Sequence, residues 1–328
     1  MPSRTLIRSA SLTHFAEIAR QCGLDPLALV RAVGLPTQCL SAPDLKIDTQ
    51  AVVRLLEMAA EQGREPAFGL RMGESRLLSN LGPLGLLLRD EPTLRHALDA
   101  IVRHIRVHNE AMVVRMEEVG DLVLIREDFA IDAACPRRQA VELAMAVTHR
   151  LLSLFMGPHW RPRLVCFAHG APARREVHHR VFGDQVEFNH EFNGLMCSRA
   201  DLNQPNPSAD PVMARYAEEL VTAKAVGTPS FTHQVQQLIL MLMPLGQCQA
   251  ELVAAHLGCD RRTVTRRLQA EQTGFHQLVN AHRRHMVAQY LQDKSRPLSH
   301  ISNLLGFASP SAFSRWHRQE FGVRARDA

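Results

Sequence analysis

A duplicated pattern near the C-terminal end of the chain constrains its fold more than any other sequence feature. LGCDRRTVTRRLQAEQTG at residues 257–274 is matched by LGFASPSAFSRWHRQEFG at residues 305–322, with Leu-Gly and the final glycine at the same places. Each copy joins a short apolar helical segment to a second helix through a glycine turn, which is the form of a helix-turn-helix motif. The sequence therefore predicts two such motifs, at about 248–270 and 299–320.

The first copy predicts a helix at 260–270 that Asp260 caps at its N-terminus. Val264 and Leu268 form an apolar seam on one side, and a polar stripe lies on the other side. The stripe consists of Arg262, Thr265, Arg266 and Gln269. Because guanidinium and amide groups make bidentate contacts with guanine and adenine in the major groove, we predict that this stripe contacts DNA bases. The alternative is an ordinary solvated helix face that has no ligand.

The second copy predicts a helix at 309–320, with Ala308 as an additional turn residue and Pro310 at the first helical position. We expect Phe313 and Trp316 to point inward. The outward stripe consists of Ser311, Ser314, Arg315 and Arg318. Since serines replace arginines here, we expect this helix to depend more on phosphate contacts than the first one.

The segment between the two motifs predicts one long helix at 276–292. About 18 helical residues span ~27 Å, and successive major-groove faces of a duplex are about 34 Å apart. One linker helix of this length is suited to hold two recognition helices in adjacent grooves on one face of a duplex.

Positive charge is concentrated in the same part of the chain. From residue 230 onward there are 12 Lys and Arg against 6 Asp and Glu, whereas the preceding residues hold 26 against 27. A basic module joined to a neutral one indicates a polyanionic partner, most often nucleic acid. No strand pattern follows Gly227, so this module is expected to be all-helical.

The residues before Gly227 predict a mixed domain. Apolar residues recur with a helical period in segments 25–33, 91–110 and 137–157. In residues 112–129 apolar and polar residues alternate on both sides of a Gly-Asp turn, which is typical of a β-hairpin. Further helices are expected at 11–21, after Asp48 and at 212–224, and further strands at 163–169, 185–188 and 194–198. Because strands and helices do not alternate regularly, the fold class is α+β.

The two-motif pattern of residues 251–323 resembles the AraC/XylS family of bacterial transcription regulators, most specifically through LGF…SAFSR…FG. N-terminal segments such as RLLEMAAEQGREPAFGLRMGE, RQAVELAMA and FNGLMCSRADLNQPNPSADP are similar to the arabinose-binding-type regulatory domain of that family. The resemblance implies an α+β effector-binding and dimerisation domain at 1–226, followed by an all-α DNA-binding domain at 227–328. It also places the family's base-contacting positions on Arg262, Thr265, Arg266, Ser311, Ser314 and Arg315.

The resemblance implies a sequence-specific, effector-responsive regulator in the cytoplasm. Its expected partners are double-stranded promoter DNA, a small-molecule effector of unknown identity, a second copy of the chain and, for an activator, RNA polymerase. No membrane partner is expected, since the apolar runs are too short to span a bilayer and no secretory signal is present. The seven cysteines form no Cys-x-x-Cys pair, so no metal or other cofactor is expected.

Two departures from the family pattern concern the second motif. Ala308 stands where the family has a small polar cap, which leaves capping to Ser309. After Val323 the chain continues as RARDA instead of the usual ending. Both departures predict weaker anchoring of the last helix.

Catalytic motifs are absent from the sequence, which contains no P-loop, Gly-x-Gly-x-x-Gly, His-Glu-x-x-His or Gly-x-Ser-x-Gly pattern, so we expect no enzymatic activity. His104 and His108 have metal-ligand spacing but are interpreted as an exposed helix face. His178, His179 and His190 are interpreted as loop and strand-surface residues. No effector-binding residue is assigned, although Arg71, Arg103, His104 and Asn109 belong to the expected domain.

Two alternatives remain beside the leading interpretation. One is a constitutive DNA-binding dimer without a small-molecule effector. The other is an enzyme whose basic tail only localises it.

Overall fold

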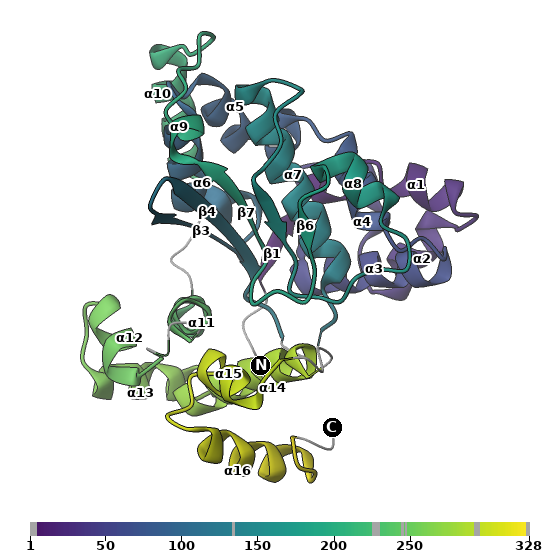
Figure 1. Cartoon of the computed structure of the whole chain (residues 1–328). Coiled ribbons are helices and arrows are strands. Elements are labelled where there is room, and N and C mark those ends of the chain that lie inside the picture. Colours follow the sequence, from purple (N-terminus) through teal and green to yellow (C-terminus); the bar gives the residue numbers. More distant parts are fainter. Residues whose placement is uncertain are drawn as a thin grey trace.

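The helices of the C-terminal third lie together along one side of a larger α+β part. The computed structural model describes residues 5–132, 135–224, 230–243, 246, 248–291 and 296–325. In Figure 1 the larger part occupies the upper half of the view and the C-terminal helices lie below the ends of its strands. The boundary predicted near Gly227 falls outside the described residues.

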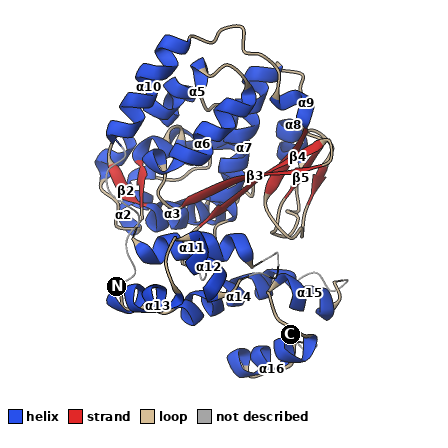
Figure 2. Cartoon of the chain, turned by 90° about the vertical axis from the view of Figure 1, so that its left-hand side faces the viewer, coloured by secondary structure: helices blue, strands red, loops and turns tan. Residues whose placement is uncertain are grey.

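A five-stranded sheet runs through the larger part in the order β3-β4-β7-β5-β6. Its strands are β3 Met112–Val119, β4 Leu122–Phe129, β5 Leu164–Cys166, β6 Val186–Glu187 and β7 Gly194–Ser198. All pairings are antiparallel except β5 with β6. The predicted hairpin is confirmed as β3 and β4, which pair Met116 with Ile125 and turn at Gly120, whose φ is 59°. A separate pair joins β1 Leu6–Arg8 to β2 Lys46–Asp48 (Figure 2).

Helices cover this sheet, and the longest of those described, α7 Arg138–Met156, packs against both β4 and the N-terminal helices. The others are α1 Phe15–Gln21, α2 Pro26–Ala32, α3 Thr49–Gln62, α4 Phe68–Glu74, α5 Pro83–Asp90, α6 Leu94–His108, α8 Glu176–Phe182, α9 Arg199–Leu202 and α10 Pro211–Lys224, with 3-10 turns η1 Ser9–Leu12, η2 Thr37–Leu40 and η3 Leu78–Leu81. None of the described helices is both long and apolar enough to cross a membrane.

Local signals explain where several of these helices begin and end. The Asp48 side chain accepts a hydrogen bond from the Ala51 amide at 2.7 Å, so the predicted cap of α3 is confirmed. Gly157, with a φ of 92°, ends α7 where the sequence predicted a stop. The single helix expected at 11–21 is wrong, because His14 adopts a left-handed conformation with φ 64° and separates η1 from α1.

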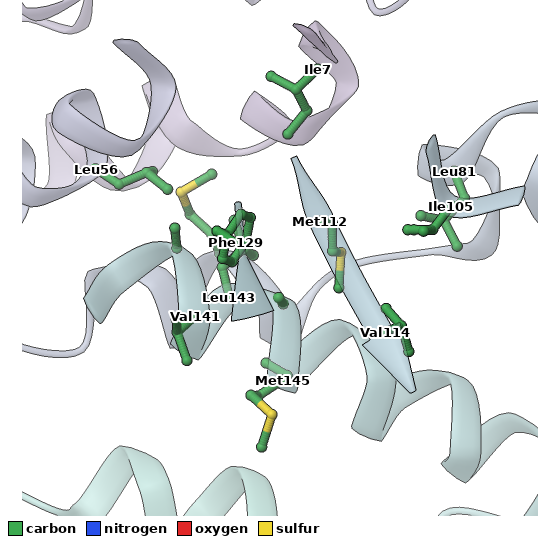
Figure 3. Close-up of a cluster of buried hydrophobic side chains, with 14 of the residues drawn as sticks. Ile7, Leu56, Leu81, Ile105, Met112, Val114, Phe129, Val141, Leu143 and Met145 are labelled. Atoms are coloured by element: carbon green, nitrogen blue, oxygen red, sulfur yellow. The ribbon is translucent and has the colours of Figure 1, made fainter. Parts of the chain in front are cut away.

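One continuous apolar core fills the larger part. Figure 3 shows side chains of this core that come from elements far apart in the sequence, among them Ile7, Leu56 and Leu143. Close packing of α4 on α7 requires glycine at Gly69, where an added Cβ would lie 2.1 Å from the Gln139 carbonyl oxygen. The core therefore joins the N-terminal helices and the sheet into one unit.

The C-terminal third is helical as expected, and its described residues form six helices. They are α11 Phe231–Leu242, α12 Ala250–His256, α13 Arg261–Ala270, α14 Phe275–Tyr290, α15 Leu298–Leu304 and α16 Pro310–Phe321. Two separate apolar clusters support them, one beneath α13 and one beneath α16. Ala325 is buried in the second cluster, so the chain after Val323 remains packed against it as far as this residue.

Glu127 on β4 is a carboxylate enclosed in the core. Only 3% of its surface is exposed, and its Oε1 accepts a hydrogen bond from the Thr148 hydroxyl of α7. Burial raises the pKa of Glu127 from its ordinary value to about 7. The folded state therefore retains a proton at pH values where the unfolded chain has already lost it.

We expect Glu127 to make the free energy of unfolding fall as pH rises from about 4.5 to about 7 and to keep it low above pH 7. Glu127→Gln should remove this decrease and make the protein more stable at pH 8, by about 3 kcal/mol. Urea unfolding at pH 4.5 and pH 8 measures the effect. Glu61→Gln, at an exposed glutamate of α3, is the control. A difference between wild type and Glu127→Gln that does not change with pH would contradict the prediction.

Candidate nucleic-acid interface

Helix α13 presents a polar face outward above an apolar seam. The Asp260 carboxylate accepts a hydrogen bond from the Thr263 amide at 2.7 Å, which caps the helix and lowers the pKa of Asp260. Val264 and Leu268 are buried in the apolar cluster beneath. All four residues of the predicted stripe are exposed: Arg262, Thr265, Arg266 and Gln269. The orientation expected for this helix is confirmed, whereas its contact with bases stays a prediction.

The four arginines of α13 differ in their partners. The wheel predicts that Arg261 and Arg267 lie off the stripe, facing phosphates or solvent. In the structure Arg261 Nη1 lies 2.7 Å from Glu251 Oε1 of α12, and the Arg267 guanidinium carbon lies 3.9 Å from the centroid of the Phe231 ring. Within the described part of the chain, Arg262 and Arg266 form no side-chain hydrogen bond or ion pair. Two guanidinium groups on the outer stripe are thus available to a ligand.

Gly258 and Gly306 explain why the sequence repeats Leu-Gly. Their φ angles are 63° and 65°, a left-handed conformation that favours glycine. Each glycine follows the C-cap residue of the first helix of its motif, and Leu305 in the second motif is fully buried. The repeated dipeptide therefore turns the chain into each recognition helix.

Helix α16 has the predicted start, and its inner face includes one residue more than predicted. Ser309 caps it by accepting a hydrogen bond from the Ala312 amide at 3.2 Å. Phe313 is buried as expected, and Trp316 packs against the same apolar cluster although it stays partly exposed. His317, for which the sequence made no prediction, is also buried, at 2% exposure. Because of the additional residue Ala308, the inner positions fall one place later than in the first copy.

The outward stripe of α16 is exposed as predicted. Its residues are Ser311, Ser314, Arg315 and Arg318. Neither arginine forms a side-chain hydrogen bond or ion pair among the described residues. The stripe of α16 therefore offers two hydroxyls and two free guanidinium groups, and its contact with DNA also stays a prediction.

The linker helix α14 holds the turn of the second motif through Arg283. Its Nε donates to the Leu305 carbonyl oxygen at 2.9 Å and its Nη2 donates to the Gly306 carbonyl oxygen at 3.0 Å. The same guanidinium lies 3.9 Å from the centroid of the Phe307 ring. Sequence reasoning missed this contact, since nothing in the spacing of α14 distinguishes Arg283 from its neighbour Arg284.

Glu271 has a comparable role at the first motif. Its carboxylate, at the end of α13, accepts hydrogen bonds from the Phe231 and Thr232 amides at 2.9 and 2.8 Å. These bonds satisfy free amides in the first turn of α11, and they lower the pKa of Glu271 although burial acts against them. The first motif is thereby fixed to the helix that precedes it.

The histidines considered as ligands are more enclosed than expected. His104 Nε2 lies 2.9 Å from Glu218 Oε1 of α10, and His108 is buried, so the interpretation as an exposed helix face is wrong. His178 is fully buried in α8, where its Nε2 lies 3.1 Å from Glu142 Oε1, so it is not a surface residue. His104 and His178 thus contact a carboxylate on another helix, and His108 lies in the core. Helical periodicity alone does not show such contacts.

One group of residues has ligand atoms that lie close enough to share a metal ion. Cys166, Glu187 and His190 place one such atom each within 4.8 Å of the others. Glu187 is exposed, and burial raises the pKa of the Cys166 thiol to about 12, which disfavours the thiolate that binds metals. We assign no metal to this group.

We predict that Arg266→Ala weakens binding to a specific duplex by about 1–3 kcal/mol and barely changes binding to random DNA. Arg261→Ala is a matched control, since it removes the same charge from the same helix at a residue already paired with Glu251. Fluorescence anisotropy titrations with both DNAs at one salt concentration measure the two effects. Equal losses on the two DNAs for Arg266→Ala would mean that this residue contacts phosphate only.

Comparison with known proteins accounts for nearly the whole chain. A model of the arabinose-binding domain of AraC transcription regulators, N-terminal, matches residues 23–206, and a model of a helix-turn-helix domain matches residues 253–327. The second match covers both motifs described above except the start of the first. The first match covers most of the α+β part.

Proteins that match more than nine-tenths of this chain are named as regulators. The HTH-type transcriptional regulator VirS of Mycobacterium tuberculosis is 30% identical over 98% of this chain and 96% of its own length. The ornithine utilization regulator of Pseudomonas aeruginosa is 24% identical over 98% of this chain and 96% of its own length. The alignment with the crystal structure of the transcriptional regulator CdpR from Pseudomonas aeruginosa covers 92% of this chain and 96% of the CdpR chain, at 20% sequence identity and a TM-score of 0.45. The chain belongs to the AraC family of transcription regulators.

Proposed function

We propose that α13 and α16 contact bases in two adjacent major grooves of promoter DNA and that a small molecule bound by residues 1–226 changes this contact. The observation that carries the proposal is the matched arrangement of the two helices. Each is capped, packed on its own apolar cluster and exposed along a stripe with two free guanidinium groups. Both views of the molecule place α16 on the side away from the α+β part, where a duplex has access to it (Figures 1 and 2).

Contacts between the two parts supply a route for the effector response. The Tyr290 hydroxyl of α14 donates to the Glu191 carbonyl oxygen at 3.1 Å, and His300 of α15 hydrogen-bonds to the carboxylate of the same glutamate. A cavity of about 220 Å³ between the sheet and α14 is lined by Glu127, His282 and Tyr290, among others. An effector that favours one arrangement of these contacts shifts the population of DNA-competent molecules.

A division into residues 1–226 and 227–328 is part of this proposal. The separate apolar clusters support it, since the first ends at Val221 and the second begins at Phe231. We place the effector in the first domain and the duplex on the second.

We further propose that the chain acts as a homodimer and, if it activates transcription, contacts RNA polymerase. Helix α10, which lies on the side of the molecule remote from α16 (Figure 1), supports the first point because it carries an exposed apolar stripe. The stripe consists of Val212, Met213, Tyr216 and Leu220, each 44–54% exposed. Leu86 of the adjacent helix α5 is 44% exposed and extends it. An apolar surface of this kind is suited to bury itself against its own copy.

Replacement of Tyr216 and Leu220 together by glutamate should convert a dimer into a monomer, because two charges would then be buried in the interface. Light scattering after size exclusion measures the mass, which for one chain is 36.7 kDa. Thr222→Glu, an exposed polar position on the same helix, is the control. A wild-type protein that elutes as a monomer, or a double variant that stays dimeric, would contradict the proposal.

The effector response is tested by a gel-shift titration of promoter DNA with and without fractions of cell-extract metabolites. We expect one fraction to change the affinity or the geometry of the complex. If no fraction does so, the chain is a constitutive DNA-binding dimer.

A further inference from the structure

A cavity of about 90 Å³ lies within the α+β part, enclosed chiefly by α3, α6, η3 and α7. Most of its walls are apolar and belong to the core of Figure 3, where Leu56, Leu81, Ile105 and Leu143 are labelled. An engineered cavity of ~150 Å³ accepts benzene, so this space fits a hydrocarbon body of about four carbons. The apolar walls therefore accept a ligand whose hydrocarbon tail is about four carbons long.

Polar atoms without a partner gather on the lining of this cavity. Among the described residues, four lining side chains have a buried nitrogen or oxygen that makes no hydrogen bond: Ser11 Oγ, Thr49 Oγ1, Arg76 Nε and His108 Nδ1. All four residues are more than nine-tenths buried. Buried polar groups are nearly always hydrogen-bonded, and such groups in one place indicate a missing polar partner.

Arg76 shows the charge of that missing partner. Its two Nη atoms donate to the carbonyl oxygens of Ala10 and Ser11, but no carboxylate of the described residues pairs with it. Burial lowers the pKa of Arg76 to about 10, so it remains charged at neutral pH. Arg8, which like Arg76 lies near His108, differs in being paired with an acid, Asp44, at 2.6 Å. An unpaired buried cation is unfavourable until an anion reaches it.

His108 adds neither a second cation nor an anion. Burial, with Arg8, Arg76 and Lys46 nearby, lowers the pKa of His108 to about 3, so its ring is neutral and offers one donor or acceptor. Thr49 and Ser11 add hydroxyl donors. The polar part of the lining therefore provides one positive charge and several hydrogen-bond donors, the set that a carboxylate requires.

We propose that this cavity is the effector site and that it takes a small aliphatic carboxylic acid. The carboxylate pairs with Arg76 and receives hydrogen bonds from Thr49 and Ser11, while the hydrocarbon chain lies between α3, α6 and α7. A sugar does not fit, because each of its hydroxyl groups would need a partner and the walls are mainly apolar. The inference rests on the proposed effector response and specifies its ligand class.

Isothermal titration of the full chain with sodium pentanoate tests the site. We expect binding of pentanoate, weaker binding of propanoate because less apolar surface is buried, and no binding of pentan-1-ol, pentylamine or arabinose. Arg76→Met should weaken pentanoate binding at least about tenfold. Arg71→Met is the matched control, since Arg71 pairs with Glu65 at 2.9 Å outside the cavity.

A second variant covers the case in which Arg76→Met does not fold. Ala144→Leu adds apolar volume to the cavity wall and keeps Arg76, so it should abolish pentanoate binding. Equal affinity for propanoate and pentanoate, binding of arabinose, or unchanged binding in both variants would overturn the site.

A gel shift with pentanoate separates the inference from the proposed function. If pentanoate binds through Arg76 and leaves DNA binding unchanged, the site stands and its regulatory role fails. If a metabolite fraction changes DNA binding while no carboxylate binds in the cavity, the effector response stands and this inference fails.

Discussion

The contact of Arg283 with the turn of the second motif is the interaction on which the DNA-binding part depends. The turn contains a left-handed glycine, Gly306, and Arg283 of the linker helix donates hydrogen bonds to two successive carbonyl oxygens of this turn. Because its guanidinium also covers Phe307, the turn, the linker and the apolar cluster under α16 form one unit. Beside Arg283, the Arg284–Glu320 ion pair, with Nη1 and Oε2 2.8 Å apart, joins α14 directly to α16. The orientation of α16 relative to α13 therefore depends on contacts of the linker helix, and Arg283 is the residue that fixes the turn.

Within the α+β part, buried polar groups lie where the apolar core is interrupted. Arg76 faces a cavity without an acid, and Glu127 is enclosed with only the Thr148 hydroxyl on one oxygen. Thr148 lines the cavity of about 90 Å³ and Glu127 lines the cavity of about 220 Å³ beside α14, so the hydrogen bond between these two side chains links the walls of the two cavities. Natural proteins depart from a fully satisfied core chiefly at functional sites. These departures point to where a ligand and the response to it would be located.

Much of the C-terminal third could be predicted from the sequence because its helices are determined by residues close together along the chain. The helices, the cap Asp260 and the exposed stripe of α13 follow from period and capping. The burial of His317 beside Phe313 and Trp316 was not predicted, because a polar ring on a helical wheel does not show that the core encloses it. His108, His178 and Arg283 were missed for another reason: their burial or partners depend on elements distant in sequence. Periodicity contains no information about such contacts.

The central claim is that one chain holds two recognition helices in adjacent grooves of the same duplex. Hydroxyl-radical footprinting of the intact protein, on a duplex that it selects from a random pool, tests this claim because backbone protection reports phosphate as well as base contacts. For each bound chain we expect two protected segments on one face of the duplex, about 10 base pairs apart. Arg283→Ala should weaken the segment contacted by α16 and leave the other in place. A single protected segment for each chain would contradict the account.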